Sequence, residues 1–229
     1  MAPLSLLPVA TLGRRQLIGG GPLARHCHRT AYVALVLSGG YVEAGIGSRR
    51  FVRAGDFLIH HPFESHFNQI ATSGAQVLNL PLPVGRSLAE AGRCTDPDLV
   101  ARVAEKDSAA AVLAIADNIA EPPPPLLQDW PDLLARELVG GHIRSLARWA
   151  HAFGLAPGTV SRGFRQTYGV SPKRYRAEAR AHRAWTALKG NERLSQLALS
   201  QGFADQSHMT RAVTALTGFP PSHWRGGEK

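Results

Sequence analysis

Cysteine is scarce in this sequence, which has only Cys27 and Cys94 among its 229 residues. Two cysteines cannot form the disulfide framework of a small secreted domain, so nothing in the composition indicates an oxidising compartment. No apolar run approaches the roughly 20 residues that a membrane-spanning helix needs. The segment Met1–Val9 also lacks a basic start before its leucines, which argues against a signal peptide. We therefore expect a cytoplasmic protein without membrane contact.

Two further absences narrow the function. The chain has no P-loop, nucleophile-elbow or dinucleotide-binding pattern, and we expect no enzymatic activity. Acidic residues are few in the C-terminal part: residues 130–229 contain 6 Asp and Glu against 15 Lys and Arg, whereas residues 1–129 contain 11 of each kind. The net charge of +9 therefore lies in the C-terminal part. It favours nucleic acid as the partner there, because a basic surface attracts phosphates.

A repeat organises this basic part of the chain. The same offset of 49 residues relates Arg162 to Arg211, Gly169 to Gly218, Pro172 to Pro221, Tyr175 to Trp224 and Arg176 to Arg225. Five coincidences at one offset indicate a repeated supersecondary unit.

Each copy has the pattern of two helices joined by a tight turn. In the first copy Gly154 supplies the turn and Pro157 suits the start of the next helix. In the second copy Gly202 supplies the turn and Asp205 the N-cap. The residues predicted to face inward at helical spacing are Leu146, Trp149, Ala150, Phe153, Val160, Phe164 and Thr167, and then Leu194, Leu197, Ala198, Met209, Val213 and Leu216. The pattern predicts two helix-turn-helix units, whose second helices enter the major groove of DNA.

A longer helix is expected between the copies, capped by Ser171 and running from Pro172 to near Gly190. Its span is roughly 28 Å at about 1.5 Å per residue, and one turn of DNA is about 34 Å. Two recognition helices held apart by such a strut can enter successive major grooves. A single chain then reads both grooves without dimerisation.

The sequences GLAPGTVSRGFRQTYGVSPKRYR and QGFADQSHMTRAVTALTGFPPSHWR carry this repeat. They resemble the DNA-binding domain of the AraC/XylS family of bacterial transcription regulators. This sequence departs from the family at Val213, where Phe is usual, and at Gly158, where many members have a side chain able to contact DNA. The resemblance implies a regulator associated with the bacterial nucleoid, with double-stranded DNA and RNA polymerase as partners.

Residue types on the outward faces predict the DNA contacts. Arg162 and Arg211 suit bidentate bonds to guanine, and Gln206 suits adenine. Phosphate contacts are expected from Arg165, Lys173 and Arg174, and solvent-facing positions from Arg176 and Arg180. The predicted DNA-contacting set is Gly158, Thr159, Ser161, Arg162, Arg165, Lys173, Gln206, Ser207, His208, Thr210 and Arg211.

The N-terminal part has short strands separated by turn residues, a pattern typical of a small antiparallel barrel or sandwich. The expected strands are Ala31–Leu37, Tyr41–Ala44, Arg49–Val52, Phe57–His60, His66–Ile70 and Ala75–Leu80. The run GDFLIHHPFESHFN, Gly55–Asn68, resembles the second motif of the cupin barrel. A cupin before a helix-turn-helix pair is the usual AraC-type order, so the two resemblances support each other.

The remaining segments set the domain limits. Leu88–Ala120 is expected to be helical, either packed on the barrel or forming the contact of a homodimer. The run Pro122–Pro125 favours an extended, semi-rigid spacer, and Asp132–Val139 a short helix. We therefore predict an all-β, cupin-like effector and dimerisation domain with trailing helices at 1–120, a Pro-rich linker at 121–131 and an all-α double helix-turn-helix domain at 132–229.

Histidines crowd the expected barrel. A cupin metal site uses a His-x-His pair, a Glu and a later His, so the resemblance makes His26, His28 and His66 candidate ligands of a divalent metal, although no carboxylate lies near Thr30–Tyr32. Alternatively the histidines line the pocket of a metal-free barrel. The candidate residues of a small-molecule effector pocket are Tyr32, Phe57, His60 and His66. The main prediction is an effector-responsive regulator; the alternative is a metal-binding cupin that senses or handles metal, with DNA binding secondary.

Overall fold

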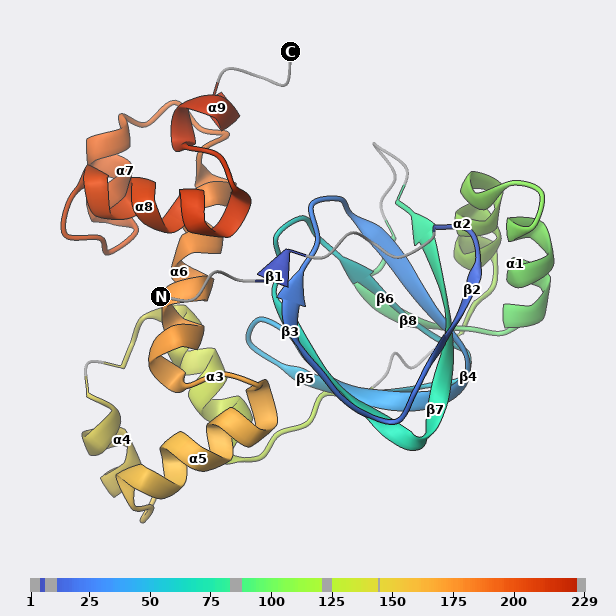
Figure 1. Cartoon of the computed structure of the whole chain (residues 1–229), viewed down its shortest axis with the longest axis horizontal. Coiled ribbons are helices and arrows are strands. Elements are labelled where there is room, and N and C mark those ends of the chain that lie inside the picture. Colours follow the sequence, from blue (N-terminus) through green and yellow to red (C-terminus); the bar gives the residue numbers. More distant parts are fainter. Residues whose placement is uncertain (1–4, 7–11, 83–87, 121–124, 144, 226–229) are drawn as a thin grey trace. The chain divides into compact units, whose positions relative to one another are not determined.

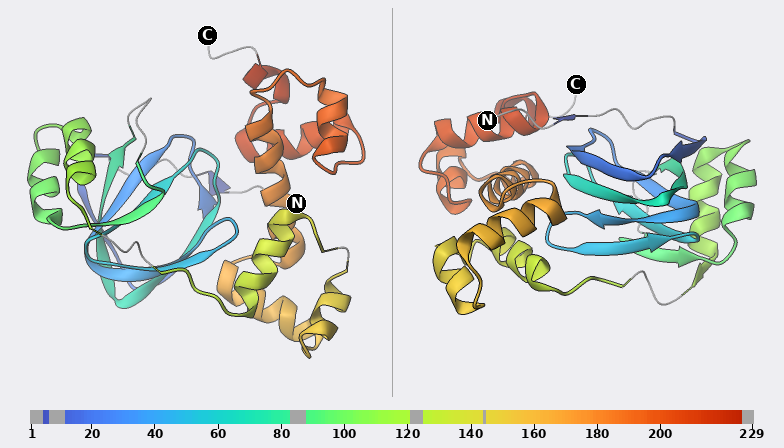
Figure 2. Two further views of the ribbon diagram at one scale, coloured as in Figure 1. Left: turned by 180° about the vertical axis from the view of Figure 1, so that it is seen from behind. Right: turned by 60° about the horizontal axis from the view of Figure 1, so that its bottom comes forward.

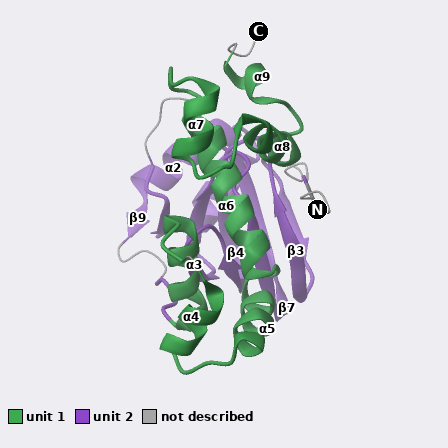
Figure 3. Ribbon diagram, turned by 90° about the vertical axis from the view of Figure 1, so that its left-hand side faces the viewer, with its two compact units in different colours: residues 1–5, 129–229 green, residues 6–128 purple. Residues whose placement is uncertain are grey.

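In the computed structural model the chain forms two compact units, residues 6–128 and residues 129–229 together with residues 1–5 (Figure 1, Figure 3). The structure describes residues 5–6, 12–82, 88–120, 125–143 and 145–225. The expected proline spacer falls mostly on residues 121–124, which lie outside this described part. The finer limits, with a linker over 121–131, stay a prediction. We refer to residues 6–128 as the N-terminal unit and to the chain from Asp129 as the C-terminal unit.

The N-terminal unit is built on one sheet, which curls around one of its faces (Figure 1, Figure 2). The described strands are β1 (Ser5–Leu6), β2 (Arg15–Ile18), β3 (Gly21–Cys27), β4 (Tyr32–Ala44), β5 (Arg49–Arg53), β6 (Asp56–His60), β7 (His66–Pro81), β8 (Ala91–Cys94) and β9 (Ile119–Ala120). Their order is β1-β3-β7-β4-β6-β8-β9, with β2 added to β7 and β5 added to β4. The sequence did not predict β2 and β3.

Two predicted breaks in the sheet are wrong, because β4 runs through Ser38–Gly40 and β7 runs through Ser73 and Gly74. The glycines instead mark an irregular part of the β4–β7 ladder, where the register shifts between Val36 and Ser38 and again between Gly39 and Tyr41. Gly39 has a φ of +69°, and a Cβ there would lie 2.1 Å from the carbonyl oxygen of Gly74. Because glycine has no side chain, β4 and β7 can bend while they lie close together at these positions, and neither strand ends there.

The two faces of the sheet carry separate cores, because successive side chains of a strand point to opposite sides. One core, on what we call the inner face, includes Tyr32, Ala34, Val36, Tyr41 and Leu58. The other, on the outer face, includes Val33, Leu35 and Phe57 and packs against residues of α1 (Pro97–Ala104) and α2 (Ser108–Asp117).

The prediction of a single helical segment over Leu88–Ala120 is wrong. That stretch contains β8, the two short helices α1 and α2, and β9. Asp96 accepts a hydrogen bond from the Leu99 amide and starts α1, and Asp107 caps the amides of Ala109 and Ala110 and starts α2. Two N-caps in one stretch therefore divide it into two helices.

The C-terminal unit is helical. Its described helices are α3 (Trp130–Gly140), α4 (Leu146–Ala152), α5 (Pro157–Tyr168), α6 (Pro172–Ala187), α7 (Leu194–Ser200), α8 (Gln206–Thr217) and α9 (Pro221–Arg225). Of the helices in the described part of the chain, none is long and apolar enough to cross a membrane. The predicted helix-turn-helix units correspond to α4–α5 and α7–α8, and the predicted strut corresponds to α6. The strut is shorter than predicted, about 24 Å for its 16 residues, because it ends at Ala187.

Aromatic and polar contacts join the first helix-turn-helix unit to α3 and α6. Tyr175 of α6 packs edge-on against Phe164 and Tyr168 of α5, with ring centroids 5.2 and 5.1 Å apart. The Tyr168 hydroxyl donates a hydrogen bond of 2.8 Å to the buried Asp132 carboxylate of α3. Phe153, predicted to face inward, is 43% exposed, and its ring stacks on Trp149 instead.

Candidate nucleic-acid interface and ligand cavity

Helix α5 has a polar outer face because its apolar residues pack into the core. Val160, Phe164 and Tyr168 are completely buried, whereas Arg162 and Arg165 are exposed. Pro157 begins the helix, and Gly169 ends it in the left-handed conformation at φ +75°. Of the other predicted contact residues in α5, Gly158 and Thr159 are exposed and Ser161 is half-buried.

Helix α8 repeats this arrangement. Met209, Val213 and Leu216 are buried, and Gly218 ends the helix at φ +83°. The predicted N-cap Asp205 is confirmed, since its carboxylate accepts a 2.7 Å hydrogen bond from the His208 amide. Exposed side chains on α8 include Gln206, Ser207 and Arg211, while His208 and Thr210 are half-buried. The His208 ring packs edge-on against Phe203, with centroids 5.2 Å apart, so it is less free to reach DNA than its neighbours.

Two glycines of α5 have different surroundings. A Cβ on Gly163 would lie 2.7 Å from Cζ2 of Trp130 in α3, too close for both groups to keep their positions. A Cβ on Gly158 would first meet the guanidinium of Arg162 at 3.4 Å, and that side chain can move. Gly163 is therefore required by the packing of α3 on α5, although glycine weakens an isolated helix by about 1 kcal/mol relative to alanine.

We expect Gly163→Ala to destabilise the C-terminal unit by about 1–3 kcal/mol, because overpacking against Trp130 outweighs the gain in helix propensity. Gly158→Ala is the matched control in the same helix and should not destabilise the unit, since the gain in helix propensity would raise the free energy of unfolding by up to about 1 kcal/mol. Urea unfolding followed by circular dichroism measures both. Equal effects of the two substitutions, or stabilisation by Gly163→Ala, would show that the Trp130 contact does not constrain this position.

The basic residues around the two units divide into exposed and engaged ones. Arg165 and Lys173 are exposed. Arg174 is tied to the buried Glu178 by a 2.8 Å hydrogen bond from its Nε, which leaves it less available for phosphate. The expectation that Arg180 faces solvent is wrong. Its guanidinium donates to the carbonyl of Gly202 at 2.9 Å and lies over the Phe203 ring at 4.4 Å, so it holds the turn between α7 and α8 against α6.

Strand register gathers the histidines of the N-terminal unit on the inner face. His26 on β3 lies opposite His66 on β7, and Tyr32 on β4 lies opposite His60 on β6. The ring centroid of His66 is 4.3 Å from that of His26, 5.4 Å from that of His28 and 4.5 Å from that of His60. These side chains line a cavity of about 250 Å³, together with Tyr41 and Asn68 among others.

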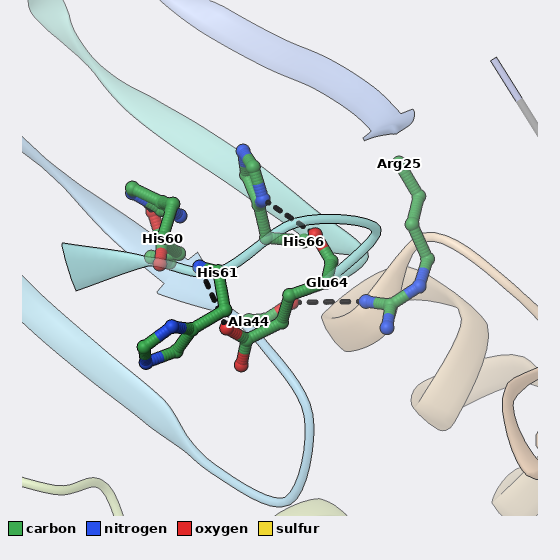
Figure 4. A network of polar contacts seen from close by, with 7 residues as sticks. Arg25, Ala44, His60, His61, Glu64 and His66 are labelled. Atoms are coloured by element: carbon green, nitrogen blue, oxygen red, sulfur yellow. Dashed lines mark hydrogen bonds and ion pairs between the residues drawn. The ribbon is translucent and has the colours of Figure 1, made fainter. Parts of the chain in front are cut away.

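The turn between β6 and β7 holds one end of this cluster (Figure 4). Glu64 accepts a hydrogen bond from the His61 amide at 3.3 Å, and its own carbonyl oxygen accepts one from Nδ1 of His66 at 3.4 Å. On β3, the guanidinium of Arg25 donates a hydrogen bond of 2.9 Å to the carbonyl oxygen of Ala44 at the end of β4. The proton on Nδ1 of His66 leaves Nε2 as the nitrogen with a free lone pair.

Burial keeps the cluster neutral. It lowers the pKa of His60 to about 3, with the neighbouring His28 and His26 adding to the effect, and it lowers the pKa of His66 well below its usual value. Burial also raises the pKa of Glu43 to about 8, helped by the charge of Glu64. His60 and Glu43, whose side chains approach to 3.5 Å, are therefore a neutral pair rather than an ion pair at pH 7.

The structure brings together five of the six residues predicted for the effector pocket or a metal: Tyr32, His60, His66, His26 and His28. Phe57 is the exception and its assignment needs correction. It is completely buried in the core of the outer face, because its place in β6 is one residue out of step with Leu58 and His60. Sequence reasoning missed Glu43, which only the β4–β7 pairing places opposite Asn68.

A family model matches part of the C-terminal unit. Residues 149–227 match a family model described as a helix-turn-helix domain. Among curated proteins, none matches the chain significantly.

Several solved structures are similar to this chain. A transcriptional regulator with an AraC-type DNA-binding domain from Chromobacterium violaceum is 25% identical over 36% of this chain and 74% of that one, with a TM-score of 0.34. The C-terminal domain of AraT, a response regulator from Geobacillus stearothermophilus, is 18% identical over 43% and 81%, with a TM-score of 0.37. ToxT from Vibrio cholerae is 10% identical over 94% of both chains, with a TM-score of 0.41.

Proposed function

We propose that this chain carries the DNA-binding domain of an AraC/XylS-type regulator and that α5 and α8 read two successive major grooves of a specific DNA site. The observation that carries the proposal is the duplicated helix-turn-helix. Arg162 and Arg211 are exposed at equivalent positions of α5 and α8, 49 residues apart. Both lie in the first half of their helix, which is the part that reaches base edges when a recognition helix enters the groove.

For the N-terminal unit we propose a cupin-like sensor that binds a small effector. Its support is the cavity of about 250 Å³, which combines apolar walls with several convergent polar groups, the usual character of a ligand site. Contacts with RNA polymerase and with a second copy of the chain stay predictions of the family resemblance. The alternative, a metal-handling protein in which DNA binding is secondary, finds no support in the matches named above.

The function is tested by dividing the chain between its units. A fragment of residues 128–229 keeps the N-cap Asp129 and both recognition helices, and we expect it to fold and to bind duplex DNA alone. Because 15 of the 26 Lys and Arg residues lie beyond residue 129, its affinity should fall steeply with salt. Fluorescence anisotropy of a labelled duplex at several salt concentrations gives the slope, about −0.9 for each phosphate contacted.

A fragment of residues 1–127 is the matched control, since residues 1–129 hold equal numbers of acidic and basic side chains. It should show no affinity for the duplex at low salt. A folded fragment 128–229 without affinity for DNA, or equal affinity of the two fragments, would contradict the proposed function.

A further inference from the structure

We propose that Glu43, His60 and His66 form a binding site for one divalent transition-metal ion inside the N-terminal unit. Each residue offers one ligand atom, and these atoms lie within 4.8 Å of one another. All three residues are buried, with exposures of 8%, 4% and 3%. The proposal goes beyond the proposed function, because it does not depend on DNA binding.

The spacing between Glu43 and His60 suits two ligands of one ion better than a hydrogen bond. Oε2 of Glu43 and Nε2 of His60 are 3.5 Å apart, and this oxygen has no hydrogen-bond partner among the described residues. Two ligands about 2.0–2.2 Å from a tetrahedral ion are themselves separated by about 3.4 Å. The pair already has the separation that a shared ion would impose.

Glu43 also has an unpartnered oxygen. Its Oε2 is buried and has no hydrogen-bond partner among the described residues. A buried polar atom without a partner carries a desolvation cost, and such atoms in native proteins often mark a bound ion or water. A metal ion between Glu43, His60 and His66 would satisfy this oxygen.

The ligand side chains are held from behind, as ligands of a bound metal usually are. Nδ1 of His66 donates a hydrogen bond to the carbonyl oxygen of Glu64, so Nε2 is the nitrogen whose lone pair can bind a metal ion. The ring of His60 stacks on Tyr32 with centroids 4.6 Å apart and planes 16° apart.

The surroundings provide an approach for a cation. A hollow of about 150 Å³ reaches Glu43 and is also lined by Glu64, Glu90 and Arg50. Three carboxyl groups therefore line the approach to Glu43, and their oxygens are groups that a cation can bind. Imidazole with carboxylate suits zinc, cobalt, nickel or iron, and three protein ligands leave a fourth position open to water or to a ligand in the cavity.

A rival arrangement shares His66. The ligand atoms of His26, His28 and His66 also lie within 4.8 Å of one another. One imidazole nitrogen cannot serve two ions, so only one of the two arrangements can use His66. We assign the ion to the arrangement with Glu43, because that one contains the unpartnered oxygen and a carboxyl group, which would lose its proton on binding the ion and so offset part of the charge of the ion.

The test is metal binding by the full-length chain after chelator treatment. Titration with Co²⁺ should give visible absorption bands of a bound ion that saturate at one equivalent, and elemental analysis after Zn²⁺ loading should give the same stoichiometry. Glu43→Gln and His60→Gln should each weaken binding by at least ~100-fold, since even partners that only orient a ligand account for 10–100-fold in affinity. Bound Zn²⁺ should raise the unfolding midpoint of the wild type but not of Glu43→Gln.

Two histidine variants serve as controls. His61→Gln replaces an exposed histidine beside the site and should bind Co²⁺ like the wild type. His26→Gln should retain binding within about threefold of the wild type, if the ion sits where we assign it. Absence of stoichiometric binding in the wild type, unchanged binding by Glu43→Gln, or loss on His26→Gln with Glu43→Gln unaffected would each overturn the assignment. Circular dichroism of every variant identifies any that fails to fold, and the wild-type stoichiometry decides independently of the variants.

Discussion

Arg211→Ala is expected to weaken binding to the specific DNA site by about 1–3 kcal/mol and to relax specificity at one or two base positions. The reason is that Arg211 is exposed on α8 beside the exposed Gln206 and Ser207, so a guanidinium bidentate to guanine would be lost. The site is first obtained by selection from a random duplex library with the full-length chain. Binding of wild type and variant to all single-base changes of that site then measures the effect.

The equivalent change in α5 provides the internal comparison. Arg162→Ala should relax specificity at positions about ten base pairs away from those affected by Arg211→Ala, because α6 sets the distance between the helices. Lys173→Ala is the control: an exposed phosphate contact should weaken all sequences alike and reduce the salt slope by about one. If both arginine variants lost affinity uniformly across the library, both arginines would contact phosphates, and the prediction that they contact base edges would be wrong.

Phe164→Ala is expected to have the largest effect on stability, about 3–5 kcal/mol. The Phe164 ring is completely buried, stacks on Tyr168 and meets Tyr175 edge-on, so its removal leaves a cavity among three aromatic positions. A whole domain is stable by only about 5–15 kcal/mol, so the first helix-turn-helix unit should be largely lost at modest urea concentrations.

The repeat offers a matched control for this prediction. Val213 occupies the position 49 residues after Phe164 and is equally buried. Val213→Ala removes two methyl groups and should cost only about 2 kcal/mol at roughly 0.8 kcal/mol per buried carbon plus a small cavity. Urea unfolding of fragment 128–229 measures both variants. Equal costs would mean that the aromatic contacts around Phe164 add nothing to its burial.

The helical unit could be predicted well because its signals are local. Periodic apolar residues, the cap Asp205 and the turn residues Gly154 and Gly202 each act within a few residues of where they stand. What failed there was a tertiary contact: Arg180 looked like a solvent-facing residue because no local signal reveals the carbonyl of Gly202 and the ring of Phe203 above it.

The sheet was predicted less well for the opposite reason. Gly39 and Gly74 carry ordinary turn chemistry in the sequence, and only their approach across the ladder shows that they permit a bend. The face of Phe57 depended on a register that the sequence does not display. The grouping of His26, His28 and His66 was accessible through a family resemblance, whereas Glu43 had no signal, since it comes from the far end of β4.

Because α6 is one continuous helix, its length sets the rotation of α8 relative to α5 as well as the distance between them. Each residue of an α-helix advances the chain by about 1.5 Å but rotates it by about 100°. Inserting one residue into α6 would therefore leave the distance between α5 and α8 almost unchanged while turning α8 away from the face of the duplex that α5 occupies. Insertions near a whole turn, three or four residues, would restore the orientation and lengthen the span by about 5 Å. The spacing between the two groove contacts of an operator can therefore change only in steps, because α6 can be lengthened only by roughly whole helical turns if both recognition helices are to stay on one face of the duplex.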